Sequence, residues 1–427
     1  MTKPVPIKEY SKKEIPKEFN LAGLNNYLKC QNLSQALKVL PDGVQSKSWV
    51  GVIKYKNLHL EILPKLISKN ANDGSDIIDE EERRKILKNL IFMLSFTKKL
   101  DIKTGDVAKL SNEKNPFLEV LIREYAQSLF DALKKFTPKR YIREEDNLNF
   151  LKGKIKFSEN IRYNHTNQAK FYCEYDEFSE NNLLNQLFLF VSTCLYNISG
   201  SSFNKKILKS ILNYYTEINL VRFDKFKVQK IKLLRSQELF KKPFNLAKMF
   251  VEQTSVDLSK NKFENITLVW DMNKLFEEFI FELIKKCKAE HNSGWKLTAQ
   301  KGRRLLVNDS SKKRNTFIDI LIENDNGKIV LDTKYKKFET VNDFSNEDVF
   351  QVSTYCLIHN AHRAILLYPQ WKDTKPDTEF SLNVERPKDD RRKNDYKIYF
   401  KTINLNLDNM KENLHYIQDE IISILNI

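Results

Sequence analysis

The feature that most constrains this chain is a twenty-residue stretch, Phe317–Lys336, which reads FIDILIENDNGKIVLDTKYK. Two apolar runs in it flank the polar tetrapeptide NDNG at residues 324–327. Asparagine and glycine readily adopt the positive φ angles that tight hairpin turns require, so the stretch predicts two antiparallel strands. Side-chain direction alternates along a strand, so every second residue of each run faces the same side.

Three charged residues of this hairpin, Asp319, Asp332 and Lys334, are predicted to share one face. A two-residue loop at 325–326 would place Asp319 opposite Asp332, whereas a loop at 326–327 would place it opposite Lys334. Directly opposed Cβ atoms lie about 5 Å apart and diagonal ones about 7–8 Å apart. In both registers the three side chains therefore form one site.

Two carboxylates and an ammonium group at this spacing suggest a Mg²⁺ site. Mg²⁺ prefers oxygen ligands, and proteins commonly hold it with one or two carboxylates plus water and substrate phosphate. The carbonyl oxygen of Thr333 is a further candidate ligand. Such an ion could activate water for attack on a phosphodiester, with help from Lys334. The alternative is a surface hairpin with a salt bridge that contributes about 0–1 kcal/mol.

The Asp-x-Lys pattern alone carries little information in a lysine-rich chain. It also occurs at residues 101–103, 373–375 and 395–397. The copy at Asp395 opens an aromatic strand, but it follows a long charged loop, and only Glu385 is a plausible preceding carboxylate. The flanking sequence therefore favours the copy at Asp332.

A predicted helix before the hairpin supplies a third acid. Apolar residues recur at helical spacing within residues 268–290 and define one buried stripe. Glu277 lies on the flank of this stripe, whereas Glu278 points nearly opposite it. Glu277 is therefore the acid that could face the site, and the alternative is a rim carboxylate paired with a lysine.

A predicted helix after the hairpin, over residues 346–359, supplies two polar residues. Gln351 and Tyr355 lie one turn apart on one face of this helix. A strand at 364–368 follows it. The order helix, hairpin, helix, strand predicts a mixed sheet flanked by helices.

Elsewhere the chain is β-rich over its first 70 residues and then mostly helical. The strand at 58–63 alternates in polarity, so one of its faces is expected to be solvated or to contact a partner. The basic segment 134–143 suits either a nucleic-acid backbone or an exposed helix end. Further strands are expected at residues 49–53, 153–163, 380–384 and 396–403, the last two at sheet edges. Further helices are expected at residues 82–99, 116–135, 179–198 (capped by Ser179), 203–215 and 407–425. Loops are expected at residues 71–82 and 385–395.

Composition narrows the class of protein. The formal charge of +16 over 427 residues favours a polyanionic partner. The sequence contains no GxxxxGK[ST] loop, so it has no P-loop nucleotidase of its own, and the HExxH and GxSxG motifs are also absent. No run of 18 apolar residues and no secretory signal is visible, and the five cysteines are scattered, so a cytoplasmic protein with reduced thiols is expected.

The charged pattern resembles the PD-(D/E)xK nucleases, and the Gln-x-x-x-Tyr helix resembles their RecB-like members. More closely, the chain is similar to the McrC family, the nuclease subunits of McrBC modification-dependent restriction systems. The similar stretches are VGVI, EILPKL, MNKLFE, FIDI, LDTKYK, EDVFQVSTY and ILLYP. Ile318 stands where the superfamily name expects proline, but that position contributes no ligand.

The resemblance implies an α+β or α/β protein with three parts. These are a β-rich part over residues 1–150 that contacts an AAA+ GTPase like McrB, a helical part over 151–265, and a PD-(D/E)xK endonuclease domain over 266–427. The implied partners are double-stranded, methylated DNA, the GTPase and a second nuclease domain, with no membrane involved. Recognition of the methylated base is expected in the GTPase, which the chain would stimulate.

The resemblance also implies residue roles. Asp319 and Asp332 would hold Mg²⁺, with Glu277 as a third acid acting directly or through water. Lys334 would position or activate the attacking water and stabilise developing charge. Gln351 and Tyr355 would orient the site or contact the DNA backbone.

Two alternative functions remain open at the sequence level. One is a stand-alone RecB-like nuclease that needs no GTPase. The other is a non-catalytic adaptor that binds DNA and activates a GTPase, with the hairpin as scaffold. DNA affinity should fall steeply with salt in all three cases, so DNA binding alone does not separate them.

Overall fold

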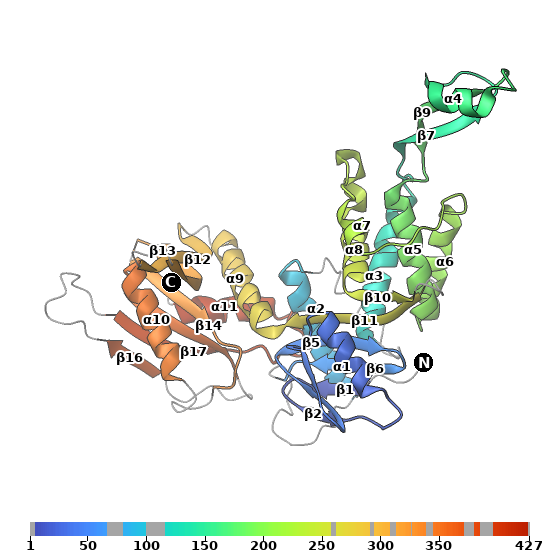
Figure 1. Cartoon of the computed structure of the whole chain (residues 1–427). Coiled ribbons are helices and arrows are strands. Elements are labelled where there is room, and N and C mark those ends of the chain that lie inside the picture. The colour runs from blue at the N-terminus through green and yellow to red at the C-terminus, as the bar shows by residue number, and fades with distance from the viewer. Residues whose placement is uncertain are drawn as a thin grey trace. The chain divides into compact units, whose positions relative to one another are not determined.

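The computed structural model describes residues 5–65, 80–99, 116–257, 262–290, 294–307, 313–325, 327–338, 345–370, 380–384 and 396–425 (Figure 1). They fall into two compact units, one containing residues 54–56 and 112–268, the other containing 2–53, 57–111 and 269–427. A division into compact units does not show which part of the chain binds which partner. The predicted division into three functional parts therefore stays a prediction. The expected loops and the three other Asp-x-Lys copies lie wholly or partly outside the described residues.

The first unit is mainly helical. Its helices are α3 Pro116–Leu133, α5 Leu183–Ile198, α6 Ser202–Tyr214, α7 Lys225–Gln229 and α8 Lys241–Glu252, with a 3-10 turn at Arg235–Phe240. Strand β10 (Thr254–Asp257) pairs antiparallel with the first part of β11 (Lys262–Asp271). The predicted cap of α5 is wrong, because Ser179 ends a strand and Asn182 accepts hydrogen bonds from the amides of Leu184 and Asn185.

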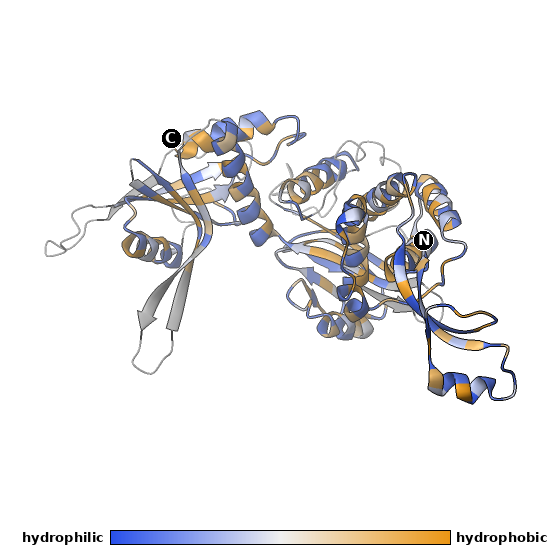
Figure 2. Cartoon of the chain, turned by 90° about the horizontal axis from the view of Figure 1, so that it is seen from above, coloured by the Kyte–Doolittle hydropathy of each residue, from blue (hydrophilic) through white to orange (hydrophobic). Residues whose placement is uncertain are grey.

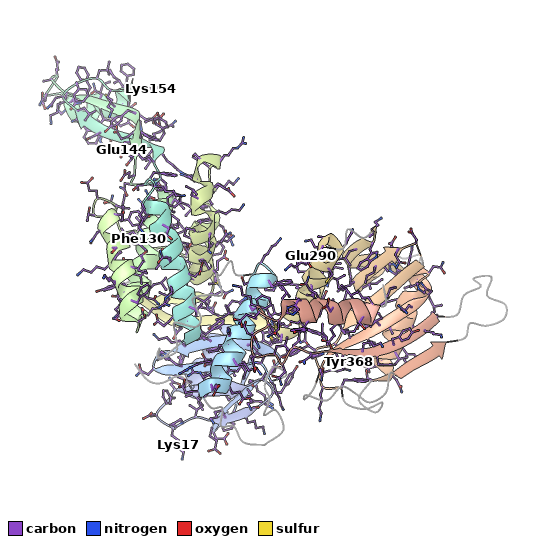
Figure 3. All side chains as sticks on the ribbon, turned by 180° about the vertical axis from the view of Figure 1, so that it is seen from behind. Lys17, Phe130, Glu144, Lys154, Glu290 and Tyr368 are labelled. Atoms are coloured by element: carbon purple, nitrogen blue, oxygen red, sulfur yellow. The ribbon has the colours of Figure 1, made fainter. Side chains whose placement is uncertain are left out.

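An arm extends from the helices of the first unit (Figure 1). It consists of β7 (Arg140–Leu148), β8 (Lys154–Ile155), α4 (Phe157–Asn164) and β9 (Phe171–Ser179), with strand order β7-β9-β8. Figure 3 labels Glu144 and Lys154 on it. Apolar residues such as Phe157 and Ile161 are exposed there among hydrophilic ones (Figure 2).

The strand predicted over residues 153–163 is wrong beyond its first residues. Only Lys154 and Ile155 are extended, and helix α4 begins at Phe157. The amide of Asn160 donates to the carbonyl of Lys156 at 2.8 Å, which closes the first helical turn.

The second unit begins with two groups of strands. Strands β1 (Val5–Lys8), β6 (Leu58–Leu63) and β5 (Trp49–Tyr55) are neighbours, and β2 (Lys12–Glu14), β4 (Gly43–Ser46) and β3 (Leu37–Val39) form a three-stranded sheet. Helices α1 (Leu21–Cys30) and α2 (Glu80–Phe96) belong to the same part of the second unit. The predicted pair of strands at 49–53 and 58–63 is confirmed.

The expected solvated face of β6 is wrong, because all six of its residues are buried. A partner within the protein, rather than water, satisfies the buried charge of this strand. Glu61 accepts a hydrogen bond from Arg83 of α2 at 2.6 Å, which pairs the charge that burial would otherwise leave isolated.

The rest of the second unit is a six-stranded mixed sheet with strand order β12-β13-β14-β15-β17-β16. The strands are β12 Lys296–Val307, β13 Lys313–Asn324, β14 Gly327–Thr333, β15 Arg363–Pro369, β16 Phe380–Val384 and β17 Tyr396–Ile403. Pairs β14–β15 and β15–β17 are parallel and the others antiparallel. Residues 380–384 form an edge strand as predicted, whereas residues 396–403 lie inside the sheet.

Three helices flank this sheet, as the sequence predicts: α9 (Met272–Glu290), α10 (Asn346–His359) and α11 (Leu414–Leu425) (Figure 1). Figure 3 shows Tyr368 within the sheet and Glu290 at the end of α9. Val352 and Cys356 of α10 belong to one buried core with Val330 and Leu366 of the sheet. This packing fixes α10 over one sheet face.

Two of these helices begin later than predicted. Helix α9 starts at Met272 because residues 262–271 belong to β11. Helix α11 starts at Leu414 because the segment before it is held by Asn89 of α2. The Asn89 side chain donates to the Leu407 carbonyl at 2.6 Å and accepts from the Met410 amide at 3.1 Å. Within the described residues, no helix combines the length and apolar character needed to cross a bilayer.

Candidate active site

The hairpin register places the two predicted aspartates opposite each other. Ile320 pairs with Leu331 and Asn324 pairs with Gly327. Continuing the same register by one position sets Asp319 against Asp332, which is one of the two predicted arrangements. The other arrangement, with Asp319 opposite Lys334, is wrong.

The backbone ladder ends just where these aspartates begin. The Asp319 carboxylate accepts hydrogen bonds from the Thr333 amide at 2.9 Å and from the Thr333 hydroxyl at 3.0 Å. A side chain therefore takes the place of the next backbone partner. This contact turns the carboxylate of Asp319 towards the end of β14, next to Asp332.

Asp332 is buried, with 1 % of its surface exposed. Its Oδ2 atom lies 2.8 Å from the Nζ atom of Lys334. The pKa of Asp332 is raised to about 7, mainly by burial and then by the charge of Asp319, while Lys334 acts in the opposite direction. When Asp319 and Asp332 are both ionised, their negative charge therefore exceeds the single positive charge of Lys334.

Lys334 connects the hairpin to α10. Its Nζ atom donates to Oε1 of Gln351 at 2.8 Å and lies 3.7 Å from Asp348. Burial lowers the pKa of Lys334, but Asp332, Asp348 and Asp319 together outweigh it, so the net pKa is raised. The side chain is therefore held as an ammonium ion.

The two polar residues predicted on α10 contact each other. Nε2 of Gln351 donates to the hydroxyl of Tyr355 at 2.7 Å. Helix α10 begins at the cap Ser345, whose side chain accepts from the amide of Asp348. Tyr355 is buried and Gln351 is exposed, so this pair leads from the core to the surface beside Lys334.

Sequence reasoning missed Asp348. This carboxylate accepts a hydrogen bond from Lys336 and lies close to Lys334, so it links both lysines to the first turn of α10. Burial raises its pKa, but the contacts with Lys336, Ser345 and Lys334 outweigh burial and lower it. A spacing of three residues from Gln351 places Asp348 on the same helix face, which is the signal that could have identified it.

Glu277 of α9 lies near the hairpin. The predicted apolar stripe of this helix is buried, and Glu277 is half-buried beside it. Burial raises the pKa of Glu277 and the charge of Asp319 raises it further, which places the two carboxylates within electrostatic reach of each other. Glu278 instead pairs with Lys99 at 2.8 Å.

The donor set suits a cation held by two carboxylates and completed by water or phosphate. Asp319 and Asp332 provide carboxylate oxygens, and Thr333 provides a backbone carbonyl between Asp332 and Lys334. Within the described residues, no group of three or more acidic, histidine or cysteine side chains is close enough to hold a metal ion. Glu277 therefore fits a role through water better than direct coordination.

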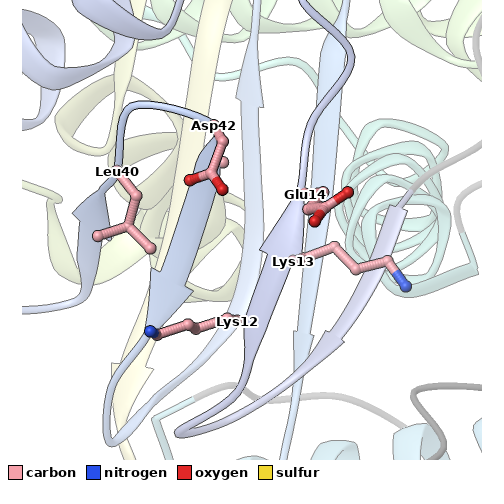
Figure 4. A pocket seen from close by; sticks show the side chains of 6 residues that line it. Lys12, Lys13, Glu14, Leu40 and Asp42 are labelled. Atoms are coloured by element: carbon pink, nitrogen blue, oxygen red, sulfur yellow. The ribbon is translucent and has the colours of Figure 1, made fainter.

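A surface hollow of about 400 Å³ lies elsewhere, beside β2 and β4 (Figure 4). Its lining residues are Lys12, Lys13, Glu14, Leu40, Asp42 and Gly43. Both signs of charge are mixed in it, and none of the predicted site residues lines it. The hollow is therefore separate from the candidate active site.

Comparisons with known proteins agree with this fold. Residues 44–369 match the family described as McrBC 5-methylcytosine restriction system component, so the chain belongs to that family. No curated protein matches the sequence. A chain from the Thermococcus gammatolerans assembly of McrB AAA+ hexamers with bound McrC has the same fold, with a TM-score of 0.70 and 20 % identity over 97 % of this chain and 100 % of that chain. A chain from the T. gammatolerans McrBC complex has a TM-score of 0.52 and 23 % identity over 66 % and 88 % of the two chains.

Proposed function

We propose that this chain is the Mg²⁺-dependent DNA endonuclease subunit of a McrBC-type restriction system, built on a PD-(D/E)xK core. The observation that carries the proposal is the convergence of Asp319, Asp332 and Lys334 at one end of the β13–β14 hairpin. Two carboxylates and an ammonium group near one another are suited to metal-assisted hydrolysis of a phosphodiester.

Asp319 and Asp332 would hold the ion, with the Thr333 carbonyl as a further oxygen donor and Glu277 acting through water. When bound, Mg²⁺ would offset the charge of a phosphodiester and make a water molecule more acidic. The raised pKa of Lys334 supports its role in stabilising charge that develops on the phosphate, rather than in removing a proton.

Gln351 and Tyr355 would act on Lys334. The Gln351 carbonyl oxygen accepts from the Lys334 ammonium, and the Tyr355 hydroxyl accepts from the Gln351 amide. This chain of hydrogen bonds fixes the direction in which the ammonium can point. The exposed side chain of Gln351 is also placed to contact a DNA backbone.

The proposed partners are double-stranded, methylated DNA, an AAA+ GTPase like McrB and a second copy of the nuclease domain. The similar T. gammatolerans structures contain McrB AAA+ hexamers together with McrC, which supports a partner of this kind here. The net charge of +16 supports a polyanionic substrate. We place the protein in the cytoplasm, where this restriction chemistry would meet DNA.

The proposal is tested by Asp332→Ala and Lys334→Ala in the purified complex with the GTPase partner. Both variants should lose DNA cleavage in Mg²⁺ and GTP, because Asp332 would hold the ion and Lys334 would stabilise charge on the phosphate. Complex formation and GTPase stimulation should stay at the level of the natural chain. Full cleavage by both variants would overturn the assignment.

The two alternatives give different results in the same assay. Cleavage by the isolated natural chain without nucleotide would favour a stand-alone nuclease. GTPase stimulation without any metal-dependent cleavage by the natural chain would favour a non-catalytic adaptor.

A further inference from the structure

Gln300 has an unusual backbone conformation. Its φ angle is +50°, in a region that residues other than glycine rarely adopt. Among the described residues other than glycine that have a positive φ angle, Gln300 alone lies within a strand. The others, Tyr10, Asn32, Lys56, Lys98 and Asn360, lie in turns. Such backbone strain is often found at functional sites, where the surrounding structure maintains it.

Gln300 lies in the same row of the sheet as the predicted metal ligands. Ala299 of β12 pairs with Ile320 of β13, and Lys301 pairs with Ile318, so Gln300 is opposite Asp319. Asp319 is in turn opposite Asp332 of β14 in the hairpin register. Three neighbouring strands therefore place Gln300, Asp319 and Asp332 side by side.

The side chain of Gln300 reaches the third acid. Its Nε2 atom donates a hydrogen bond to Oε1 of Glu277 on α9. Glu277 and Asp319 repel each other when both are ionised, so an unrestrained Glu277 would turn away into solvent. A neutral amide donor on the adjacent strand opposes that movement without adding charge.

We propose that Gln300 is a positioning residue that holds the Glu277 carboxylate beside Asp319 and thereby keeps the third acid in reach of the bound cation. This inference rests on the proposed function. In this positioning role the side-chain amide of Gln300 is required. In a purely structural role only the φ angle of residue 300 would matter.

The variant Gln300→Gly separates the two roles. Glycine adopts a positive φ at no steric cost, so the backbone shape is kept while the amide is removed. We expect the melting temperature to stay the same or to rise. The affinity for Mn²⁺, measured by titration calorimetry on the full chain, should fall about tenfold, which is typical when the support of a metal-binding group is lost. Should the glycine variant fold poorly, Gln300→Asn replaces it, because asparagine tolerates the same φ and its side chain is one methylene shorter, which moves the amide away from Glu277.

A double-mutant cycle with Glu277→Gln shows whether Gln300 acts through Glu277. In the Glu277→Gln background, Gln300→Gly should cause no further loss of Mn²⁺ affinity. Unchanged Mn²⁺ binding by Gln300→Gly, or an equal loss in both backgrounds, would overturn the proposal.

The variant Asp319→Asn, assayed in parallel, distinguishes failure of the Gln300 proposal from failure of the proposed function. If Asp319→Asn loses Mn²⁺ binding and DNA cleavage while Gln300→Gly changes neither, only the role of Gln300 fails. If Asp319→Asn retains both properties, the proposed nuclease site itself fails.

Discussion

At the scale of single residues, the protonation of Asp332 governs the candidate site. Its pKa is raised to about 7 by burial and by Asp319, so without a cation the carboxyl is largely protonated below neutral pH. A divalent cation must displace that proton, because only the carboxylate is a good ligand. Cation affinity and proton affinity are therefore coupled at this residue.

We predict that Mg²⁺ binding strengthens as pH rises from about 6 to about 8. Below the pKa of Asp332 a rise of one in pH should change the apparent dissociation constant by up to about tenfold, and above it the curve should flatten. Titration calorimetry in buffers of different ionisation enthalpy would measure both the affinity and the proton released. An affinity that is constant across this range would contradict the prediction.

At the residue scale, the sequence indicates most of the side chains that lie together at this end of the hairpin, and their catalytic roles stay a prediction. The spacing within FIDILIENDNGKIVLDTKYK predicts that Asp319, Asp332 and Lys334 share one face. The structure pairs Asp332 with Lys334, and the hairpin register sets Asp319 opposite Asp332. Asp348 and Gln300 were missed for a physical reason. Each acts through a partner on another element. The spacing from Gln351 indicates the face of α10 that carries Asp348, but it does not indicate that Lys334 and Lys336 lie against that face.

At the scale of elements, boundaries depend on contacts that a local pattern does not contain. Helix α5 was expected to start from Ser179, but Asn182 caps it. Asn182 also donates to the carbonyl of Pro138 at 2.8 Å, which ties the helix start to the chain that follows α3. A residue that satisfies both the helix amides and a distant carbonyl is favoured over one that satisfies neither.

We predict that Asn182→Ala destabilises the protein by about 1–2 kcal/mol, because it removes the cap of α5. Ser179→Ala is the matched comparison and should cost about 0.5 kcal/mol or less. Urea unfolding of both variants, followed by circular dichroism, would measure the difference. Equal losses for the two variants would mean that Asn182 is not the effective cap.

At the scale of the whole molecule, a buried acid connects the first strands to the part of the second unit that contains the six-stranded sheet. Glu9 is fully buried, and its pKa is raised to about 8, with burial as the largest cause. Contacts with Lys65 and the side chain of Tyr335 lower the pKa, whereas Asp271 raises it. Tyr335 follows Lys334 directly and lies 5.8 Å, centroid to centroid, from the ring of Phe276, so Glu9 supports the segment behind the candidate site.

The pKa of Glu9 predicts how stability depends on pH. Because the folded-state pKa lies above the ordinary value of 4.5, the folded chain binds more protons between pH 4.5 and about 8. The contribution of Glu9 to stability is therefore complete below pH 4.5, falls as pH rises, and is lost once pH passes about 8. A tenfold difference in proton affinity between the folded and unfolded chain corresponds to about 1.4 kcal/mol of stability.

We expect Glu9→Gln to be more stable than the natural chain by a few kcal/mol above about pH 8, with the gain shrinking towards about pH 5. Urea unfolding across this pH range, from acidic to alkaline, measures the trend. Glu14→Gln, at an exposed position of β2, is the control and should show no such pH dependence. A loss of stability at every pH in Glu9→Gln would show instead that the carboxyl group itself is required.

The sequence by itself determined the hairpin, the pairing of its aspartates within two registers, the two helices beside it and the mixed sheet. These follow from turn chemistry and from the periods of strands and helices, which are local properties of the chain. Only the tertiary structure decided the burial of β6, the helix at residues 157–164, the late start of α11 and the contacts of Asp348 and Gln300. Each of these depends on a partner distant in sequence, and the free energy of burying or pairing a polar group is set by that partner rather than by the residue's neighbours along the chain.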